Sequence, residues 1–176
     1  MITFQKIRWK NFLSTGDHWS EIDFLGNTTN LVVGTNGSGK STMLDALTFS
    51  LFNKPFRKIN KSQLVNATNE KDCVVEVEFT VNNKDYLVRR SIKPNKFDIE
   101  VNGTLLHKES DDRLNQKILE ENILKVNYKS FTQIVILGSS SFVPFMQLST
   151  SNRRDVIEDL LDIRIFSAMN SLIKEK

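Results

Sequence analysis

Apolar and polar residues alternate with a period of about two along the first 24 residues of the chain. Residues 2–12 carry apolar side chains at this spacing with one shift of phase, which predicts a β-strand that contains an irregularity. Turn residues follow at 14–17, and a second short alternation at 21–24 predicts another strand. The β-branched run Asn30–Val33 predicts a short buried strand. The N-terminal region therefore holds two or three predicted strands.

The apolar spacing changes to that of a helix after residue 40. The stripe that shows this consists of Met43, Leu44, Leu47, Leu51 and Phe52. It predicts a helix from Ser41 to Phe52, which Asn53–Pro55 ends because proline cannot continue a helix. The next segment, Arg57–Ser62, is basic and polar and is predicted to be a loop.

Residues 73–106 return to a period of two and predict an antiparallel meander. Its strands are expected at 75–81, 86–92 and 97–101. The pair Asn102-Gly103 is typical of a two-residue hairpin turn.

The last third of the chain mixes both periods. Ser110–Asp112 can cap a helix that runs to about Leu124. The β-rich run Phe131–Leu137 predicts a buried strand, with a loop at 138–141. Ser149 or Thr150 caps a last helix, and the sequence reaches Lys176 without a helix-ending Gly or Pro. We therefore expect a domain at 1–150 and the root of a longer helix or coiled coil at 151–176.

One stretch carries recognisable chemistry. Residues 34–42, Gly-Thr-Asn-Gly-Ser-Gly-Lys-Ser-Thr, match the phosphate-loop pattern G-x-x-x-x-G-K-[ST] between a predicted strand and a predicted helix. Glycines let backbone N–H groups approach phosphate oxygens, and the helix N-terminus adds partial positive charge. Lys40 is expected to contact the β- and γ-phosphates and Ser41 to bind Mg²⁺. The alternative is a Gly/Ser-rich turn that binds nothing, and the strand–loop–helix context favours a nucleotide site.

Composition narrows the class of protein. The chain has 176 residues, 39% of them hydrophobic, and a net charge of +3, which permits a nucleic-acid partner without requiring one. The single Cys73 cannot form an internal disulfide, which fits a reducing cytoplasm. No signal peptide or membrane-spanning run is predicted. Five basic residues are hypotheses for DNA contacts: Arg57, Lys58, Lys61, Lys93 and Lys96.

The hydrolytic half of a phosphate-loop ATPase is missing from the predicted strands. Such an ATPase needs an apolar strand that ends in Asp, usually beside Glu, to hold Mg²⁺ and orient water. The candidate strands end at Val81, Ile92 and Leu137, none with that pair.

Two groups of residues resemble one known family. Lys10–Ser14 and Leu31–Leu47 resemble the coiled-coil ATPases of double-strand-break repair, which include SbcC and are related to the SMC and ABC ATPases. Tyr128–Val135, Phe142–Met146 and the residues 149–154 are similar to the T-even-type phage branch of that family. The similarity extends over nearly the whole chain, in the family's order.

The resemblance implies a mixed α/β fold, namely the N-terminal lobe of a split ABC-type ATPase head. A C-terminal half of the same chain would supply the signature motif and the Asp-Glu strand. Two heads would sandwich two ATP molecules, with Mg²⁺, and their closure would control the access of double-stranded DNA to a partner metallo-nuclease. That nuclease would dock near Arg153–Lys176. A phage-encoded protein would work in the host bacterial cytoplasm.

By position, the resemblance assigns the phosphate loop and two further places. The expected nucleotide contacts are Gly34, Asn36, Gly37, Ser38, Gly39, Lys40, Ser41 and Thr42, with Val65, Asn66 and Ala67 near the base. Lys40 is the expected catalytic residue and Ser41 the Mg²⁺ ligand. Ser139 falls where the family has the glutamine that reaches Mg²⁺, and Leu13 stands where the family usually has Arg.

Other functions remain open from the residues alone. An SMC-type structural DNA clamp would use the same split head. A small phosphate-loop kinase would need an acceptor-binding lid and its own acidic strand, and a transporter ATPase would need a signature motif; neither set of features is found.

Overall fold

The computed structural model describes residues 2–27, 29–106, 111–136, 145–161, 163, 165, 169 and 173. The chain forms two compact units, Met1–Ile118 and Leu119–Lys176. The domain boundary at residue 150 and the coiled-coil root after it remain predictions.

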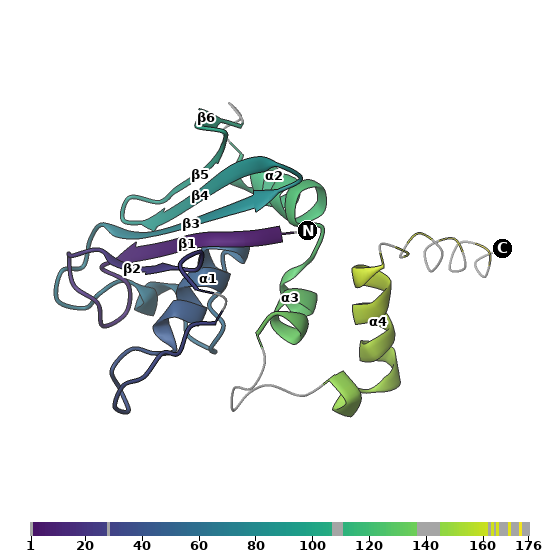
Figure 1. The fold of residues 1–176 in the computed structure, drawn as a ribbon, viewed down its shortest axis with the longest axis horizontal. Coiled ribbons are helices and arrows are strands. Elements are labelled where there is room, and N and C mark those ends of the chain that lie inside the picture. The colour runs from purple at the N-terminus through teal and green to yellow at the C-terminus, as the bar shows by residue number, and fades with distance from the viewer. Residues whose placement is uncertain are drawn as a thin grey trace. The chain divides into compact units, whose positions relative to one another are not determined.

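The first unit is built on a six-stranded antiparallel sheet in the order β2-β1-β3-β4-β5-β6 (Figure 1). The strands are β1 (Ile2–Lys10), β2 (Ser20–Asp23), β3 (Cys73–Val81), β4 (Lys84–Ile92), β5 (Lys96–Val101) and β6 (Thr104–Leu105). The predicted meander is confirmed as β3 to β6. Strand β1 pairs with both β2 and β3, so it lies inside the sheet rather than at its edge.

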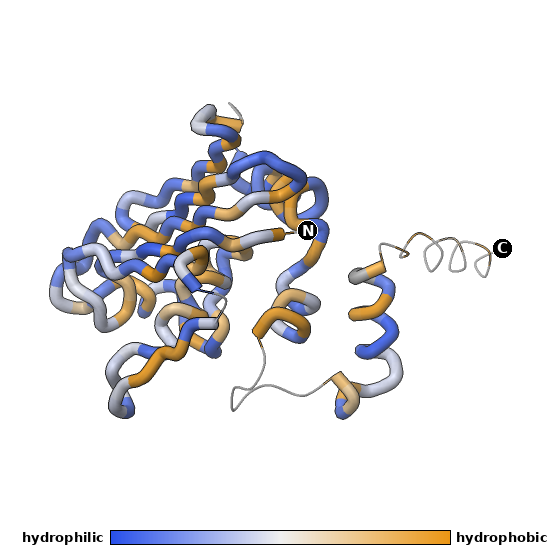
Figure 2. Tube along the Cα trace, in the orientation of Figure 1, coloured by the Kyte–Doolittle hydropathy of each residue, from blue (hydrophilic) through white to orange (hydrophobic). Residues whose placement is uncertain are grey.

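The register explains why a period of two was visible in the sequence. Ile7, Val77, Val88 and Ile99 lie opposite one another on neighbouring strands, and all four are fully buried. Apolar and polar residues alternate along these strands (Figure 2). The pairing shifts between Phe4 and Lys6, which is the irregularity that the change of phase predicted.

The other face of the sheet carries cross-strand charges. Glu76 on β3 lies between Arg8 on β1 and Arg89 on β4, and its side chain is only 3% exposed. Both guanidinium groups donate through Nε to the carboxylate, Arg89 at 2.5 Å. The hydrogen bond to Glu76 raises the pKa of Arg89. A buried carboxylate with two cationic donors is satisfied, so the charged face ties three strands together.

Helix α1 (Thr42–Phe52) packs against β1, β3 and β4 and confirms the helix predicted there. Most of its residues are buried, including the polar Asp45, Thr48 and Ser50. Ser50 Oγ donates to the Val88 carbonyl at 3.3 Å. The helix ends at Asn53, whose backbone adopts φ 57° and donates to the Phe49 carbonyl.

The remaining elements are short. They are η1 (Lys61–Leu64), α2 (Asp112–Lys117), the π-helix η2 (Ile118–Leu124), α3 (Tyr128–Ile134), η3 (Phe145–Gln147) and α4 (Thr150–Leu160). The helix predicted from about 110 to 124 is confirmed as α2 and η2. Its cap is Asp111, whose side chain accepts from the Arg113 N–H at 2.9 Å.

The strand predicted at Phe131–Leu137 is wrong over its described part, because Tyr128–Ile134 is the helix α3. The Asn127 side chain caps it by accepting from the Ser130 N–H at 2.9 Å. Thr132 Oγ1 also donates to the Tyr128 carbonyl at 2.9 Å. Local capping therefore overrides the β propensity of the apolar run.

The buried strand predicted at Asn30–Val33 is also absent. These residues have no regular structure, and Leu31 and Val33 are 87% and 80% exposed. A strand exists only where a neighbour accepts its ladder of hydrogen bonds, and none of the described strands pairs with this segment.

In the second unit, α4 begins at Thr150, as predicted. Lys129 on α3 donates to Asn152 and Asp155 on α4, at 3.0 and 3.1 Å. Within the described part of the chain, every helix is too short or too polar to cross a lipid bilayer.

Cys73 gives a simple test of the core of the first unit. It is fully buried, and burial raises the pKa of its thiol to about 12. Because the thiolate is the reactive form, we expect an aromatic disulfide reagent at pH 8 to modify native protein about three orders of magnitude more slowly than unfolded protein, whose thiol pKa is about 8.5. Equal labelling rates with and without denaturant would contradict the buried position. Cys73 is the only cysteine, so no other thiol contributes.

Candidate functional site

A cavity of about 610 Å³ opens at the N-terminus of α1. Its lining residues are Leu13, Ser14, Asn36, Gly37, Gly39, Lys40, Ser41, Thr42, Arg57, Ile59, Gln63, Val65 and Ala67. One wall is the polar phosphate loop. The other comes from the turn after β1 and from residues 57–67, and it includes four apolar side chains. A volume of this size is ordinary for a small-molecule site.

The phosphate loop has the backbone that its glycines predict. Gly37 and Gly39 adopt φ values of 86° and 91°, which side-chain-bearing residues rarely take. A Cβ on Gly34 would meet Ser38 Oγ at 2.5 Å, so a larger residue there would require the Ser38 hydroxyl to turn away. The Thr42 N–H donates to the Gly39 carbonyl at 2.9 Å as α1 begins. The loop therefore turns directly into the helix N-terminus, where N–H groups remain available for an anion.

Lys40 is held by the loop itself. Its Nζ donates to the carbonyls of Gly34 and Thr35, both at 2.7 Å. The ammonium thus lies at the mouth of the loop and lines the cavity. An arriving phosphate would find the charge already in place.

The three residues predicted to lie near the base, Val65–Ala67, do not all face the cavity. Val65 and Ala67 line the cavity, whereas Asn66 does not. The Asn66 side chain donates to the carbonyls of Leu13 and Thr15, at 3.2 and 3.1 Å. Its oxygen accepts from two backbone N–H groups, those of residues 68 and 69, at 2.9 and 3.0 Å. Asn66 therefore joins two turns at the edge of the cavity and has no hydrogen-bonding capacity left for a ligand.

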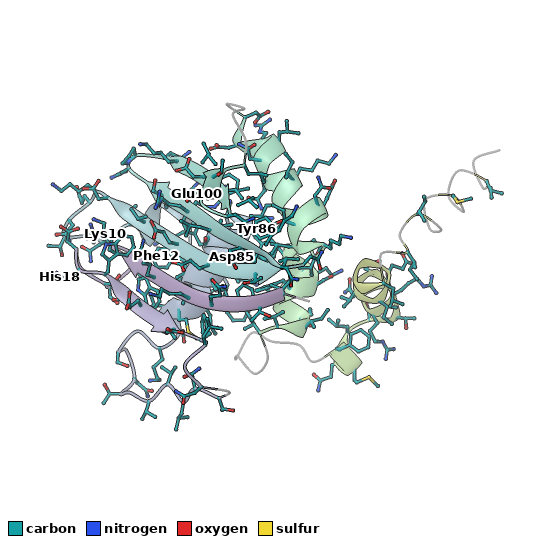
Figure 3. All side chains as sticks on the ribbon, turned by 45° about the horizontal axis from the view of Figure 1, so that its top comes forward. Lys10, Phe12, His18, Asp85, Tyr86 and Glu100 are labelled. Atoms are coloured by element: carbon teal, nitrogen blue, oxygen red, sulfur yellow. The ribbon has the colours of Figure 1, made fainter. Side chains whose placement is uncertain are left out.

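Phe12 anchors the turn that carries Leu13 and Ser14. It is fully buried just after β1 (labelled in Figure 3). Its ring centroid lies 5.7 Å from that of Phe49 on α1. Leu13 adopts φ 54° and its N–H donates to the Leu64 carbonyl at 2.7 Å. The packing of Phe12 thereby fixes the turn against residues 64–67.

Sequence reasoning missed five residues of the second wall: Leu13, Ser14, Arg57, Ile59 and Gln63. Arg57 was a DNA hypothesis, but its guanidinium is paired with Asp45 of α1, at 2.7 Å from Nε and 2.5 Å from Nη2. Asp45 is fully buried. A buried carboxylate needs a cationic partner, but Asp45 lies outside the predicted apolar stripe, so the sequence did not show that it is buried.

The other predicted site residues are placed as follows. Asn36, Gly37, Gly39, Ser41 and Thr42 line the cavity with Lys40, whereas Gly34 and Ser38 shape the loop behind it. Ser139 lies outside the described residues. Among the residues that are described, no group of three or more His, Cys, Asp or Glu side chains could hold a metal ion. Among the described residues, the predicted side-chain ligand for Mg²⁺ is the hydroxyl of Ser41, and Mg²⁺ prefers oxygen ligands.

Comparisons with known proteins give the family of the chain. Residues 6–176 match the family model described as AAA domain. The chain is 42% identical, over 96% of its length, to "Exonuclease subunit 2" of Enterobacteria phage T4. It is also 30% identical, over 94%, to a subunit of the nuclease SbcCD of Staphylococcus aureus (strain MRSA252), and 27% identical, over 97%, to the "DNA double-strand break repair Rad50 ATPase" of Thermoplasma volcanium. The chain spans 30%, 18% and 19% of the lengths of these three relatives.

One solved structure shares the fold. It comes from work on the structural biochemistry of ATP-driven dimerization and DNA stimulated activation of SMC ATPases, with a TM-score of 0.60 and 22% identity. The match covers 90% of this chain and 99% of that chain. The chain therefore belongs to the AAA domain family, and the phage exonuclease subunit, the SbcCD subunit and the Rad50 ATPase named above are its relatives.

Proposed function

We propose that this chain is the ATP-binding part of a DNA repair or recombination nuclease complex. The observation that carries the proposal is the phosphate loop at one wall of a 610 Å³ cavity, in a chain 42% identical to a phage exonuclease subunit. ATP binding and hydrolysis would govern the access of DNA ends to a partner metallo-nuclease.

The residues of the loop divide the binding of MgATP between them. The N–H groups of the glycine-rich turn and of the α1 N-terminus would receive the β- and γ-phosphates. Lys40 would exchange its two carbonyl partners for phosphate oxygens, and it is the proposed catalytic residue because it stabilises charge on the transferring group. Ser41 would hold Mg²⁺, and Thr42 would bind an oxygen nearer the ribose. Ser139 stays a proposal for a water-mediated Mg²⁺ contact.

The exposed apolar segment Leu31–Val33 supports the proposal of a split head. It precedes the phosphate loop without a neighbouring strand, and none of the described strands ends in an acidic pair. A C-terminal half of the chain would pair with this segment and bring the Asp-Glu strand beside the loop. It would also bring the signature motif that faces the phosphate loop of a second head. Hydrolysis would depend on that half and on the dimer.

Further partners follow from the relatives. A metallo-nuclease would bind near the proposed coiled-coil root, residues 153–176, and double-stranded DNA would lie across the engaged heads. The alternative is an SMC-type structural clamp, which would use the same fold. Association with a nuclease would separate the two functions, because a clamp requires none. Neither the kinase nor the transporter function gains support from the described residues.

Replacing Lys40 with alanine should remove the charge at the mouth of the loop. We expect binding of MgATP to weaken by at least about 100-fold, because a charge-assisted contact to a triphosphate is lost, and hydrolysis by the full-length protein to cease. Isothermal titration calorimetry and a phosphate-release assay would measure these effects. Unchanged ATP affinity in a folded Lys40→Ala protein would refute the assignment of the site.

DNA binding by the basic loop can be tested through its salt dependence. If Lys58 and Lys61 each contact one DNA phosphate, changing both to glutamine should reduce the slope of log K against log salt by about 1.8, at about 0.9 per contact. Fluorescence anisotropy with a duplex at several salt concentrations would measure the slope. Lys84→Gln, on the exposed start of β4, is the matched control. An unaltered slope in the double variant would place DNA elsewhere.

A further inference from the structure

Arg57 occupies an unusual position for a residue of a basic surface loop. It lines the cavity, yet its Nε and Nη2 both face the buried carboxylate of Asp45. Its backbone N–H donates to the same carboxylate at 2.8 Å. Among the described residues, Nη1 has no hydrogen-bond partner, and the side chain remains 46% exposed. One edge of the guanidinium is therefore fixed to the protein and another is available to the cavity.

Asp45 is what brings Arg57 to the cavity. The carboxylate stands on α1 four residues after Ser41, and the Asp45 N–H donates to the Ser41 carbonyl. Residues 54–60 contain no helix or strand. The three contacts with Asp45 bend this segment back along α1, so that Arg57 and Ile59 face the same cavity as Ser41.

The helix geometry places this contact away from the terminal phosphates. The N-terminus of α1 receives the β- and γ-phosphates, and four residues of helix advance about 6 Å along the axis. Apart from the phosphate loop, the cavity that Arg57 lines carries the apolar side chains of Leu13, Ile59, Val65 and Ala67. An apolar wall of this kind suits a ribose and a base better than phosphates, and a planar guanidinium can stack on a base or donate to its oxygen and nitrogen acceptors.

We propose that Arg57 contacts the nucleoside half of bound ATP and that Asp45 is its positioning residue. This inference rests on the proposed ATP site. Lys40 and the loop N–H groups hold the triphosphate, while Arg57 adds affinity that depends on the nucleoside. Asp45 touches no ligand and acts by fixing the guanidinium and the backbone of residue 57.

The test compares MgATP with magnesium tripolyphosphate, which has the phosphates and no nucleoside. In the full-length protein, we expect Arg57→Gln to raise the Kd of MgATP about 10-fold, the size of one charge-assisted hydrogen bond, and the Kd of tripolyphosphate less than about twofold. Asp45→Asn should give the same pattern, and the double variant should be no weaker than Arg57→Gln alone. Calorimetry measures both ligands, and thermal unfolding reports whether each variant is folded.

The controls separate this inference from the proposed function. Lys84→Gln removes a charge on the exposed start of β4 and should alter neither Kd, whereas Lys40→Ala should weaken both ligands. An unchanged ratio of the two Kd values in Arg57→Gln would overturn the nucleoside contact. If Asp45→Asn is folded and weakens both ligands equally, its positioning role is overturned. If Asp45→Asn does not fold, Arg57→Lys tests the dependence on the guanidinium that Asp45 holds. This variant keeps the charge without the guanidinium edge, so it should lose most of the same preference for MgATP, and a full preference would overturn the inference. Failure of the unmodified protein to bind either ligand would instead remove the ATP site itself.

Discussion

The packing of α1 against the sheet is the constraint on which the rest of the first unit depends. Residues Asp45–Phe52 are all buried, so the helix cannot rotate or slide without opening the core formed with β1, β3 and β4. The first turn of the same helix carries Ser41 and Thr42 at the cavity. The position of the phosphate loop is therefore set by core side chains that do not line the cavity. A substitution that loosens this core would also displace the loop.

The two cationic side chains that line the cavity, Lys40 and Arg57, are held by different kinds of partner. Lys40 is held by neutral carbonyls of its own loop, which a phosphate oxygen can replace at little cost because one acceptor is exchanged for a stronger one. Arg57 is held by a buried carboxylate, which it cannot leave without uncovering an unpaired charge. A phosphate can therefore replace the carbonyl partners of Lys40, whereas the Arg57–Asp45 pair stays in place as part of the cavity wall.

The sequence predicted those parts whose signal is local. Strands β1 and β3 to β5 alternate because one face is buried and the other solvated, and the glycines of the loop report a backbone that only glycine adopts readily. The apolar runs at Leu31–Val33 and Phe131–Leu137 gave wrong strands, because a run of β-branched residues does not show whether a neighbouring strand exists. The sequence did not link Arg57 to Asp45, because the two residues are 12 positions apart and no periodic pattern connects them. Only the path of the segment back along α1 brings the two residues together.

The hydrogen bonds of Asn66 have a consequence for how substitutions at the site would be read. Its carboxamide donates two hydrogen bonds and accepts two, all with backbone groups. Aspartate would lack the two donors, and leucine would lack both the donors and the acceptor. A deep mutational scan would find this position as intolerant as Lys40, although it lies outside the cavity lining. Intolerance at Asn66 would reflect the hydrogen bonds that join the two turns. A list of ligand contacts drawn from such a scan would therefore include Asn66 wrongly.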